Sequence, residues 1–533
     1  MTVRARNRLL PATAGILLAL AMSPQAAVLL RHAGQRWLHI LMISLLAAAL
    51  FTPLVRSLAF RIGALDQPDH RKRHKAPTAL LGGLAVYGGF MAALVANAIF
   101  DRATVVTLTA GSVIMAVSLI DDVRHLPATF KLAVQLCATA TVVAAGVRIE
   151  LLPTGDAGET ARLLAGTGNT LLSFLWIVGI TNAMNFLDGM DGLAAGLTAV
   201  ISLFLGIVAF QTGQPQLGWT AMAMLGASLG FLPFNFRRDR PALIFLGDAG
   251  STFMGFTLAC LAIRGDWSSS SPLVSLFTPI LLFGVLIFDM IHTTVARIWT
   301  GRVKSFRDWV AYVGRDHIHH RLQRLFLSDK KAVLFILAIG GCLGISAVVM
   351  REAGIFHASL LVLQGCLGFL MFSITNFYQE RTFVRLRNDR SAFRLQEHLD
   401  VEVRPAEGTG QQALLLDISA TGARIMYHAG VSLEPGMLVS LGDHELLHEE
   451  PRGRVVWSNR VLLDELPGHY SSEFAECGIS FIDFSPEQFQ RFVCNLYQKQ
   501  ISDRRSRFLD PGRLPLPATR LPESVPCTAN TGI

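Results

Sequence analysis

Long apolar runs separated by short polar loops make up the chain as far as residue 377. A helix that crosses a bilayer needs roughly 17 to 25 mostly apolar residues, so runs of this length predict membrane-spanning helices. The run at 9–30 follows three arginines and contains two prolines, which leaves a signal-peptide-like segment as the alternative there. The predicted spans lie near residues 9–30, 38–60, 79–100, 104–120, 131–148, 169–187, 191–211, 217–235, 242–263, 273–298, 331–350 and 355–377.

The pattern changes after residue 377. A polar, basic stretch comes first, as is typical of a segment beside anionic lipid, and short β-like runs between turn residues follow, which favours a small antiparallel barrel. The end of the chain is rich in Pro, Arg and Ser and is predicted to be disordered. We therefore predict a polytopic α-helical membrane protein with 11–12 transmembrane helices and a small C-terminal β-barrel domain. Its parts are an extra N-terminal segment that is a possible additional helix (1–37), a membrane domain (38–377), a basic linker (378–395), the β-rich domain (396–500) and a disordered tail (501–533).

The composition agrees with a membrane protein, since 51% of the residues are hydrophobic and 16% are charged. A net charge of +8 would also suit a nucleic-acid-binding protein, but the basic residues gather in the loops 61–78, 236–241 and 299–330. Basic loops lie on the cytoplasmic side of membrane proteins, so the charge predicts orientation and no nucleic-acid partner. The seven cysteines have neither paired nor metal-ligand spacing and predict no disulfide.

Four polar clusters interrupt or end the apolar runs. They are Asp121-Asp122, Asp188-Gly-Met-Asp191, Gly247-Asp248 and His317-Ile-His-His320. Counting spans from the basic loops places all four at the cytoplasmic surface, although they lie far apart in the sequence. Ionisable residues gathered at one membrane face predict an active site, whereas a transporter would carry them near mid-span.

The clusters contain the side chains that divalent cations and phosphates bind. Asp188 and Asp191 have no Lys or Arg near them in the sequence, which favours Mg²⁺, with a polar helix–helix contact as the alternative. Adjacent Asp121 and Asp122 point to different sides of a helix, so one can bind a metal while the other accepts a proton or positions a nucleophile. The histidines lie beside arginines and suit the phosphates of a nucleotide, with zinc as the competing ligand.

Five ordered motifs occur between residues 38 and 377. They are Asp69–Pro77 with Gly82-Gly83, Asp121-Asp122, Asn182-x-x-Asn185-Phe-x-Asp188-Gly-x-Asp191-Gly-Leu193, Gly247-Asp248-x-Gly-Ser251 and His317-Ile-His-His320. With these motifs the stretch resembles the polyprenyl-phosphate N-acetylhexosamine-1-phosphate transferase family (glycosyltransferase family 4), which contains the MraY and WecA enzymes. The histidine motif is closer to the WecA-like branch. The segment before residue 38 and the long 299–316 stretch depart from the usual pattern of the family.

The resemblance implies a reaction in which a polyprenyl phosphate attacks the sugar-linked phosphate of a UDP-sugar and UMP is released. It implies that Asp121, Asp122 and Asp188 are catalytic and that Asp248 and Asp188 hold Mg²⁺, with Mn²⁺ as a substitute. The residues that it assigns to substrate binding are Lys75, Asn182, Asn185, Asp191, His317, His319, His320 and Arg321.

A second resemblance lies beyond the membrane domain. Arg390 and Arg394 are four residues apart, and a turn with Asp417, Ser419 and Gly422 follows. This arrangement resembles the PilZ domain, which binds cyclic di-GMP: the arginines would hold its phosphates and the turn its bases. A PilZ-like barrel that has lost its ligand is the alternative.

Together the two resemblances predict a transferase of the bacterial inner membrane that initiates a lipid-linked cell-envelope glycan or exopolysaccharide and responds to cyclic di-GMP. The expected partners are polyprenyl phosphate, a UDP-sugar, the lipid bilayer and cyclic di-GMP, and a homodimer is a possible assembly. The active site and the C-terminal domain are expected in the cytoplasm. The alternative is a non-catalytic, membrane-anchored cyclic di-GMP receptor on a degenerate transferase scaffold.

Overall fold

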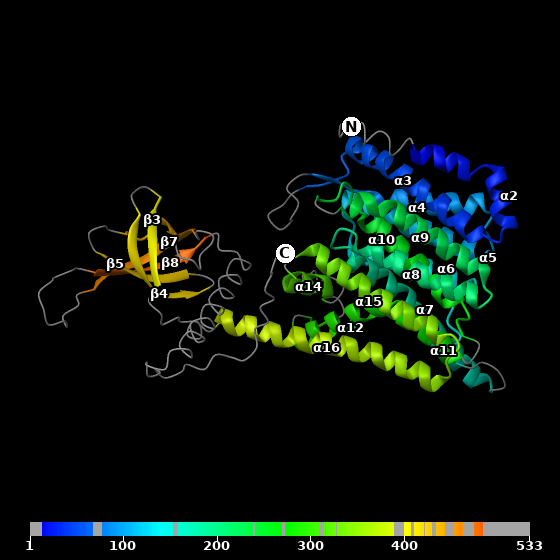
Figure 1. Cartoon of the computed structure of the whole chain (residues 1–533). Helices are drawn as coiled ribbons and strands as arrows, with labels where there is room; N and C mark the ends of the chain where they lie inside the picture. The colour runs from blue at the N-terminus through cyan, green and yellow to red at the C-terminus, as the bar shows by residue number, and fades with distance from the viewer. Residues whose placement is uncertain are drawn as a thin grey trace, which may run out of the picture. The chain divides into compact units, whose positions relative to one another are not determined.

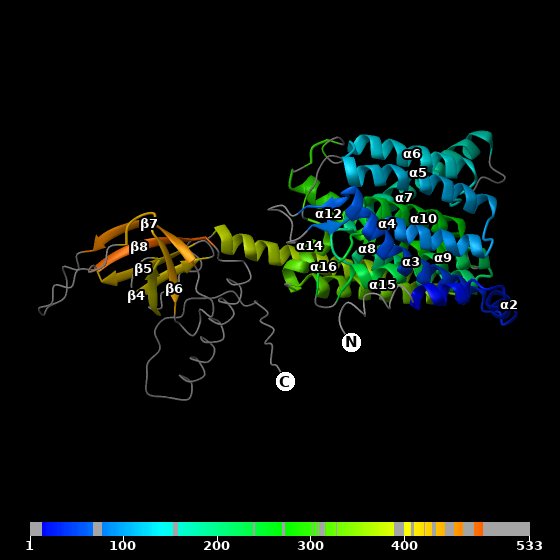
Figure 2. The same cartoon turned by 90° about the horizontal axis from the view of Figure 1, so that it is seen from above.

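A computed structural model of the chain divides into two compact units, Met1–Ile374 and Thr375–Ile533 (Figures 1 and 2). The first unit is a bundle of helices, and the second contains a sheet. The structure describes residues 13–67, 77–152, 158–237, 240–268, 272–301, 303–305, 308, 314, 316–326, 328–388, 399–406, 410–419, 422–428, 433–442, 452–461 and 474–482.

The helices of the first unit follow the apolar runs of the sequence. Their bounds are α2 Pro24–His32, α3 Arg36–Ile62, α4 Gly82–Ala96, α5 Arg102–Arg124, α6 Ala128–Ala144, α7 Glu159–Leu187, α8 Leu193–Gln211, α9 Pro215–Asn235, α10 Gly247–Arg264, α11 Pro272–Leu282, α12 Gly284–Trp299, α14 Ile318–Phe326, α15 Asp329–Met350 and α16 Ile355–Asn388. Two short strands, β1 (Leu65–Asp66) and β2 (Thr78–Ala79), pair antiparallel between α3 and α4.

Among the described residues, seven helices are long and apolar enough to cross a membrane, or nine spans if each of two bent helix pairs counts as one. The bent pairs are Thr13–Ala21 with α2, at 61°, and Leu273–Leu282 with α12, at 77°. Helices α4 and α6 are shorter apolar helices. Each predicted span therefore coincides with a helix or a bent pair, and the predicted class, a polytopic helical membrane protein, is confirmed.

Helix α10 lies in the middle of the bundle, where α4, α5 and α7 surround it. Every residue from Ala249 to Ala262 is buried. Small residues allow this close packing: a Cβ added to Gly83 of α4 would lie 2.3 Å from the backbone nitrogen of Gly250. The backbone N–H groups of Gly82 and Gly83 donate to the carbonyls of Phe245 and Leu246, at 3.0 and 2.8 Å. The start of α4 is thereby fixed against the start of α10.

The second unit contains a closed antiparallel barrel with the strand order β3-β4-β5-β8-β7-β6. Its strands are β3 Leu399–Pro405, β4 Gln411–Ser419, β5 Gly422–His428, β6 Leu438–Gly442, β7 Arg452–Val461 and β8 Phe474–Phe481. Alternate residues along the strands, such as Val403, Ile425 and Ile479, are buried in the barrel core. The predicted small barrel is confirmed.

Helix α16 continues to Asn388, so the first part of the predicted linker is helical. The sequence contains no glycine or proline between Phe369 and Asn388 to end the helix. The predicted disordered tail (501–533) lies outside the described residues.

Candidate active site

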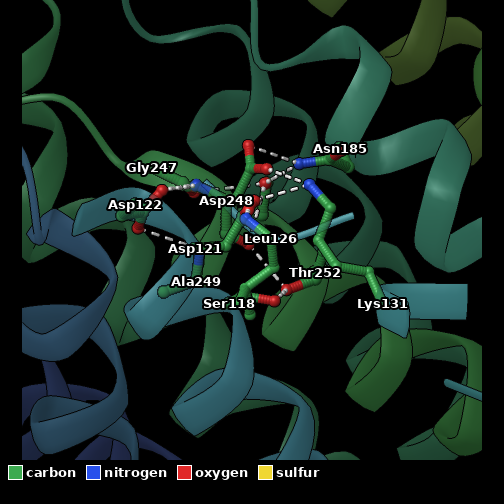
Figure 3. Close-up of polar contacts among 11 residues, drawn as sticks. Ser118, Asp121, Asp122, Leu126, Lys131, Asn185, Gly247, Asp248, Ala249 and Thr252 are labelled. Carbon is green, nitrogen blue, oxygen red and sulfur yellow. Dashed lines mark hydrogen bonds and ion pairs between the residues drawn. The ribbon is translucent and has the colours of Figure 1, made fainter. Parts of the chain in front are cut away.

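The two carboxylates at the end of α5 point to different partners (Figure 3). Asp121 is buried and accepts hydrogen bonds from the backbone N–H of Leu126 and from Lys131 Nζ, both at 2.5 Å. Asp122 accepts from the backbone N–H groups of Asp248, at 2.9 Å, and Ala249, at 3.3 Å. These N–H groups belong to the first turn of α10, where a helix has unpaired donors and a positive end. Asp122 therefore fixes the start of α10 against the end of α5.

Asp248 is the point at which four helices meet. Its Oδ1 accepts from Asn185 Nδ2 of α7 at 2.9 Å, and its Oδ2 lies 3.2 Å from Lys131 Nζ of α6. Asn185 Nδ2 also donates to Ser251 Oγ at 3.0 Å. The predicted residues Asp121, Asp122, Asn185 and Asp248 thus form one connected polar network (Figure 3).

Sequence reasoning missed Lys131 and Gln135, which α6 directs toward this network. Gln135 Oε1 accepts from Nδ2 of Asn182 at 2.7 Å, so Asn182 joins the site through α6. The two residues are four apart in an otherwise apolar helix, which places them on one face. That spacing was the signal that would have identified them.

The segment after α7 begins with Asp188, whose carboxylate has no hydrogen-bond donor among the described residues. Burial raises its pKa well above the ordinary value, and the nearby charges of Asp248, Asp122 and Asp191 raise it further. Asp191 differs, because its Oδ2 accepts from the backbone N–H of Ala242 at 3.1 Å. The neighbouring carboxylates therefore destabilise the ionised form of Asp188. Asp191, by contrast, fixes this segment to the chain that follows α9.

The donor set fits a magnesium ion. Asp121, Asp122, Asp188 and Asp248 lie together, and among the described residues Lys131 is the one basic side chain that hydrogen-bonds to any of them. Mg²⁺ uses one or two carboxylates and completes its shell with water and phosphate oxygens. Both oxygens of Asp122 accept backbone hydrogen bonds. The oxygens of Asp248 face Asn185 and Lys131, whereas the carboxylate of Asp188 has no donor among the described residues.

The predicted histidines lie against the end of α7. The ring of His317 stacks on Phe186 with 5.4 Å between centroids, and the ring of His319 lies 6.0 Å from that of His317. His319 is only 1% exposed, and a Cβ added to Gly189 would lie 2.5 Å from its Nε2. Neither ring nitrogen of His319 has a hydrogen-bond partner within the described part of the chain. The histidine motif and the Asp188–Asp191 segment are therefore in contact.

Two further observations concern the protonation of His319 and the capacity of the histidines to hold a metal. Burial lowers the pKa of His319 well below its usual value. Within the described residues, no group of three or more His, Cys, Asp or Glu side chains is arranged to hold a metal. This holds for the histidines and for the carboxylates around Asp248 alike, so the described residues provide neither zinc nor magnesium with three such ligands.

The comparisons with known proteins decide the family. Residues 104–266 match the profile of "Glycosyl transferase family 4". The chain is 35% identical over 321 residues to a "Probable undecaprenyl-phosphate N-acetylglucosaminyl 1-phosphate transferase" of Bacillus subtilis (strain 168). The match covers 60% of this chain and 86% of the relative's length. The chain belongs to glycosyl transferase family 4. The resemblance predicted from the motifs is confirmed, and so is the enzyme class, a phospho-sugar transferase.

Two other proteins match a similar part of the chain. A "Decaprenyl-phosphate N-acetylglucosaminephosphotransferase" of Mycobacterium tuberculosis (strain CDC 1551 / Oshkosh) is 33% identical over 57% of this chain and 81% of its own length. An "Undecaprenyl-phosphate alpha-N-acetylglucosaminyl 1-phosphate transferase" of Escherichia coli (strain K12) is 25% identical over 61% of this chain and 87% of its own.

Residues 388–498 of this family 4 protein match the profile of the PilZ domain, which confirms the second resemblance. In the barrel, Ser419 pairs with Gly422 and Asp417 with Arg424, so the predicted turn connects β4 to β5. Arg390, Arg394 and, in the membrane unit, Lys75 lie outside the described residues. His320 and Arg321 follow His319 in α14, where the rings of His319 and His320 are 4.1 Å apart.

Proposed function

We propose that the chain transfers N-acetylglucosamine 1-phosphate from its UDP-sugar to a polyprenyl phosphate, releases UMP, and thereby initiates a lipid-linked glycan in the bacterial inner membrane. The observation that carries the proposal is the network of Asp121, Asp122, Asn185, Asp248 and Lys131, which gathers the motif residues of a transferase family at one end of the bundle. The sugar is proposed from the names of the three relatives, each of which specifies N-acetylglucosamine.

In the proposed reaction an oxygen of the lipid phosphate attacks the phosphorus that carries the sugar, and the bond from that phosphorus to the UMP oxygen breaks. Such a transfer depends mainly on positioning and on neutralising charge. Mg²⁺, held by Asp188 and Asp248, would neutralise the diphosphate when bound. Asp121, fixed by Lys131 and Leu126, would orient the lipid phosphate or accept its proton. Asp122 would hold Asp248 in place through the start of α10.

The substrate-binding residues form the rest of the proposed site. Asn185 would position the metal ligand Asp248, and Asn182 would act through Gln135. Both nitrogens of His319 are unpaired among the described residues and closed to solvent, so a phosphate or a uridine group of the nucleotide would bind there once the Asp188–Asp191 segment moves away from the ring. The basic loops 61–78 and 299–330 support a cytoplasmic position for this end of the bundle, on the side where UDP-sugars occur.

The test is a release assay for UMP. Purified protein in lipid nanodiscs is incubated with undecaprenyl phosphate, Mg²⁺ and a panel of UDP-sugars. We expect UMP from UDP-N-acetylglucosamine, and a loss of more than about 100-fold in Asp248→Asn, because a metal ligand and the acceptor of Lys131 are removed together. Asp266→Asn, at an exposed carboxylate, is the control and should retain full activity. Folded wild-type protein that releases no UMP from any donor would favour the non-catalytic receptor.

We also propose that cyclic di-GMP bound at the PilZ domain regulates the transferase. Support comes from α16, which continues to Asn388, where the PilZ match begins. In the membrane unit the ring of Phe369 of α16 stacks on Phe288 of α12 at 4.3 Å, and Phe372 lies 6.0 Å from the same ring. Helix α12 in turn contacts the histidine segment, so a displacement of α16 would be transmitted through α12 to the active site.

The regulation is tested by repeating the UMP assay with and without cyclic di-GMP. A change in kcat that disappears in Arg390→Ala/Arg394→Ala is expected, because the double variant lacks the proposed phosphate-binding pair. Isothermal titration with the nucleotide measures binding directly. Saturating cyclic di-GMP without any change in rate would refute regulation and leave the transferase proposal intact.

A further inference from the structure

Asp289 of α12 is a buried carboxylate for which the sequence motifs provide no role. Its side chain is 1% exposed. Its Oδ2 lies 2.6 Å from His317 Nδ1, and its Oδ1 accepts the backbone N–H of Ile318, also at 2.6 Å. A buried carboxylate is costly unless its oxygens are hydrogen-bonded, and here both are. Each oxygen of Asp289 thus contacts one of the first two residues of the histidine segment.

The contact with His317 selects one form of the imidazole. A carboxylate accepts, so Nδ1 carries the proton that faces Asp289. Arg297 Nη2 lies 3.3 Å from Nε2 of the same ring, and Arg297 has donors only. Nε2 is therefore the unprotonated nitrogen, and His317 is the neutral Nδ1–H tautomer. With Phe186 stacked on its face, this ring is fixed on three sides.

The contact with Ile318 fixes the start of α14. Ile318 is the first residue of this helix, and an acceptor at a helix N-terminus stabilises an unpaired N–H group. The next residue is His319, whose ring packs against Gly189 with both nitrogens unpaired among the described residues. Since His317 uses both of its nitrogens within the protein, His319 is the ring of this pair with hydrogen-bonding capacity left for a substrate.

We infer that Asp289 is a positioning residue for the transfer reaction: it holds the His317 ring and the start of α14 so that His319 is presented to the Asp188–Asp191 segment. The inference rests on the proposed function, because it assigns the histidine segment to the substrate. It also assigns different roles to the two histidines: His317 is held in place by Asp289, and His319 contacts the nucleotide.

The variant Asp289→Asn isolates the contact with His317. An asparagine oxygen still accepts the N–H of Ile318, but the amide NH₂ meets Nδ1 as a donor. His317 must then place its proton on Nε2, against the donors of Arg297. We expect kcat/KM for the UDP-sugar to fall about 10- to 100-fold, the usual loss when the partner that orients a ligating histidine is changed. KM does not depend on the folded fraction, and we expect it to rise by about threefold or more in this variant.

A double-mutant cycle separates positioning from general stability. In a His317→Ala background Asp289→Asn should change kcat/KM by less than about threefold, because its partner is already absent. The control is Asp101→Asn, at a carboxylate that pairs with Arg264 at 2.8 Å near the opposite end of α5. It should lower the thermal midpoint without changing kcat/KM.

Each outcome bears on the inference. An unchanged KM with a rate that falls only in proportion to the folded fraction, or an equal loss in the two backgrounds, overturns it. If the wild type releases no UMP, the proposed function has failed, and the same cycle is measured on the Kd for UMP. There a loss of affinity in Asp289→Asn that vanishes with His317→Ala supports positioning, and unchanged affinity overturns it.

Discussion

Removal of the Lys131 charge provides a direct test of how the carboxylates of this family 4 enzyme are organised. Lys131→Met keeps a long unbranched side chain and deletes both hydrogen bonds, to Asp121 at 2.5 Å and to Asp248 at 3.2 Å. The side chains of Lys131 and Asp248 are 28% and 39% exposed, whereas that of Asp121 is 9% exposed. The change therefore leaves one largely buried and one partly solvated carboxylate without a cation.

The magnitude follows from these contacts. A hydrogen bond to a charged group is worth about 1.5–3 kcal/mol when buried, and partial solvation reduces the contribution of the Asp248 contact. For the two contacts of Lys131 together we estimate a loss of about 2–3 kcal/mol of transition-state stabilisation. With about 1.4 kcal/mol per factor of ten, kcat/KM should fall roughly 30- to 140-fold.

The assay is UMP release as a function of Mg²⁺ concentration, with Lys331→Met at the exposed start of α15 as the control. Loss of a neighbouring positive charge does not weaken cation binding, so the Mg²⁺ concentration that gives half of the maximal rate should stay the same or decrease. A wild-type rate at saturating Mg²⁺ would refute the reasoning, because Lys131 would then only neutralise charge that the metal can neutralise in its place.

Two further predictions concern packing and pH. Gly83→Ala should prevent folding, measured as the yield of monodisperse protein in detergent, because the added Cβ would lie 2.3 Å from the Gly250 nitrogen. The control is Gly179→Ala, which has open space around the added Cβ and should fold. A normal yield of Gly83→Ala would contradict the close packing of α4 on α10. In a chelator, the thermal midpoint of the wild type should fall as pH rises from the ordinary carboxyl range to the raised pKa of Asp188. Over that range the unfolded state has already lost the proton and the folded state still holds it, so a rise in pH favours the unfolded state. Asp188→Asn should flatten this pH dependence, and an identical slope in both proteins would exclude Asp188 as its cause.

Some of the site was readable from the sequence because its residues are grouped in short motifs. Asp121-Asp122, Asn185 and Asp248 stand at the ends of apolar runs, and the loop charges place those ends on one face. The positions of Lys131, Gln135 and Asp289 were not readable in this way. None of them belongs to a short motif: Lys131 and Gln135 lie four apart within α6 and Asp289 lies within α12, and the packing of the helices identifies their partners.

The sequence by itself determined the class of the molecule: apolar runs of spanning length require helices in a bilayer, and alternating short runs after residue 396 require a sheet. Only the tertiary structure decided which polar groups pair. Asp122 binds the start of α10, Asp289 binds His317, and His319 is left with unpaired nitrogens in the described part of the chain. The physical reason is that periodicity fixes the face of a helix, whereas a hydrogen bond depends on atoms within about 3 Å, which the packing of helices distant in sequence provides.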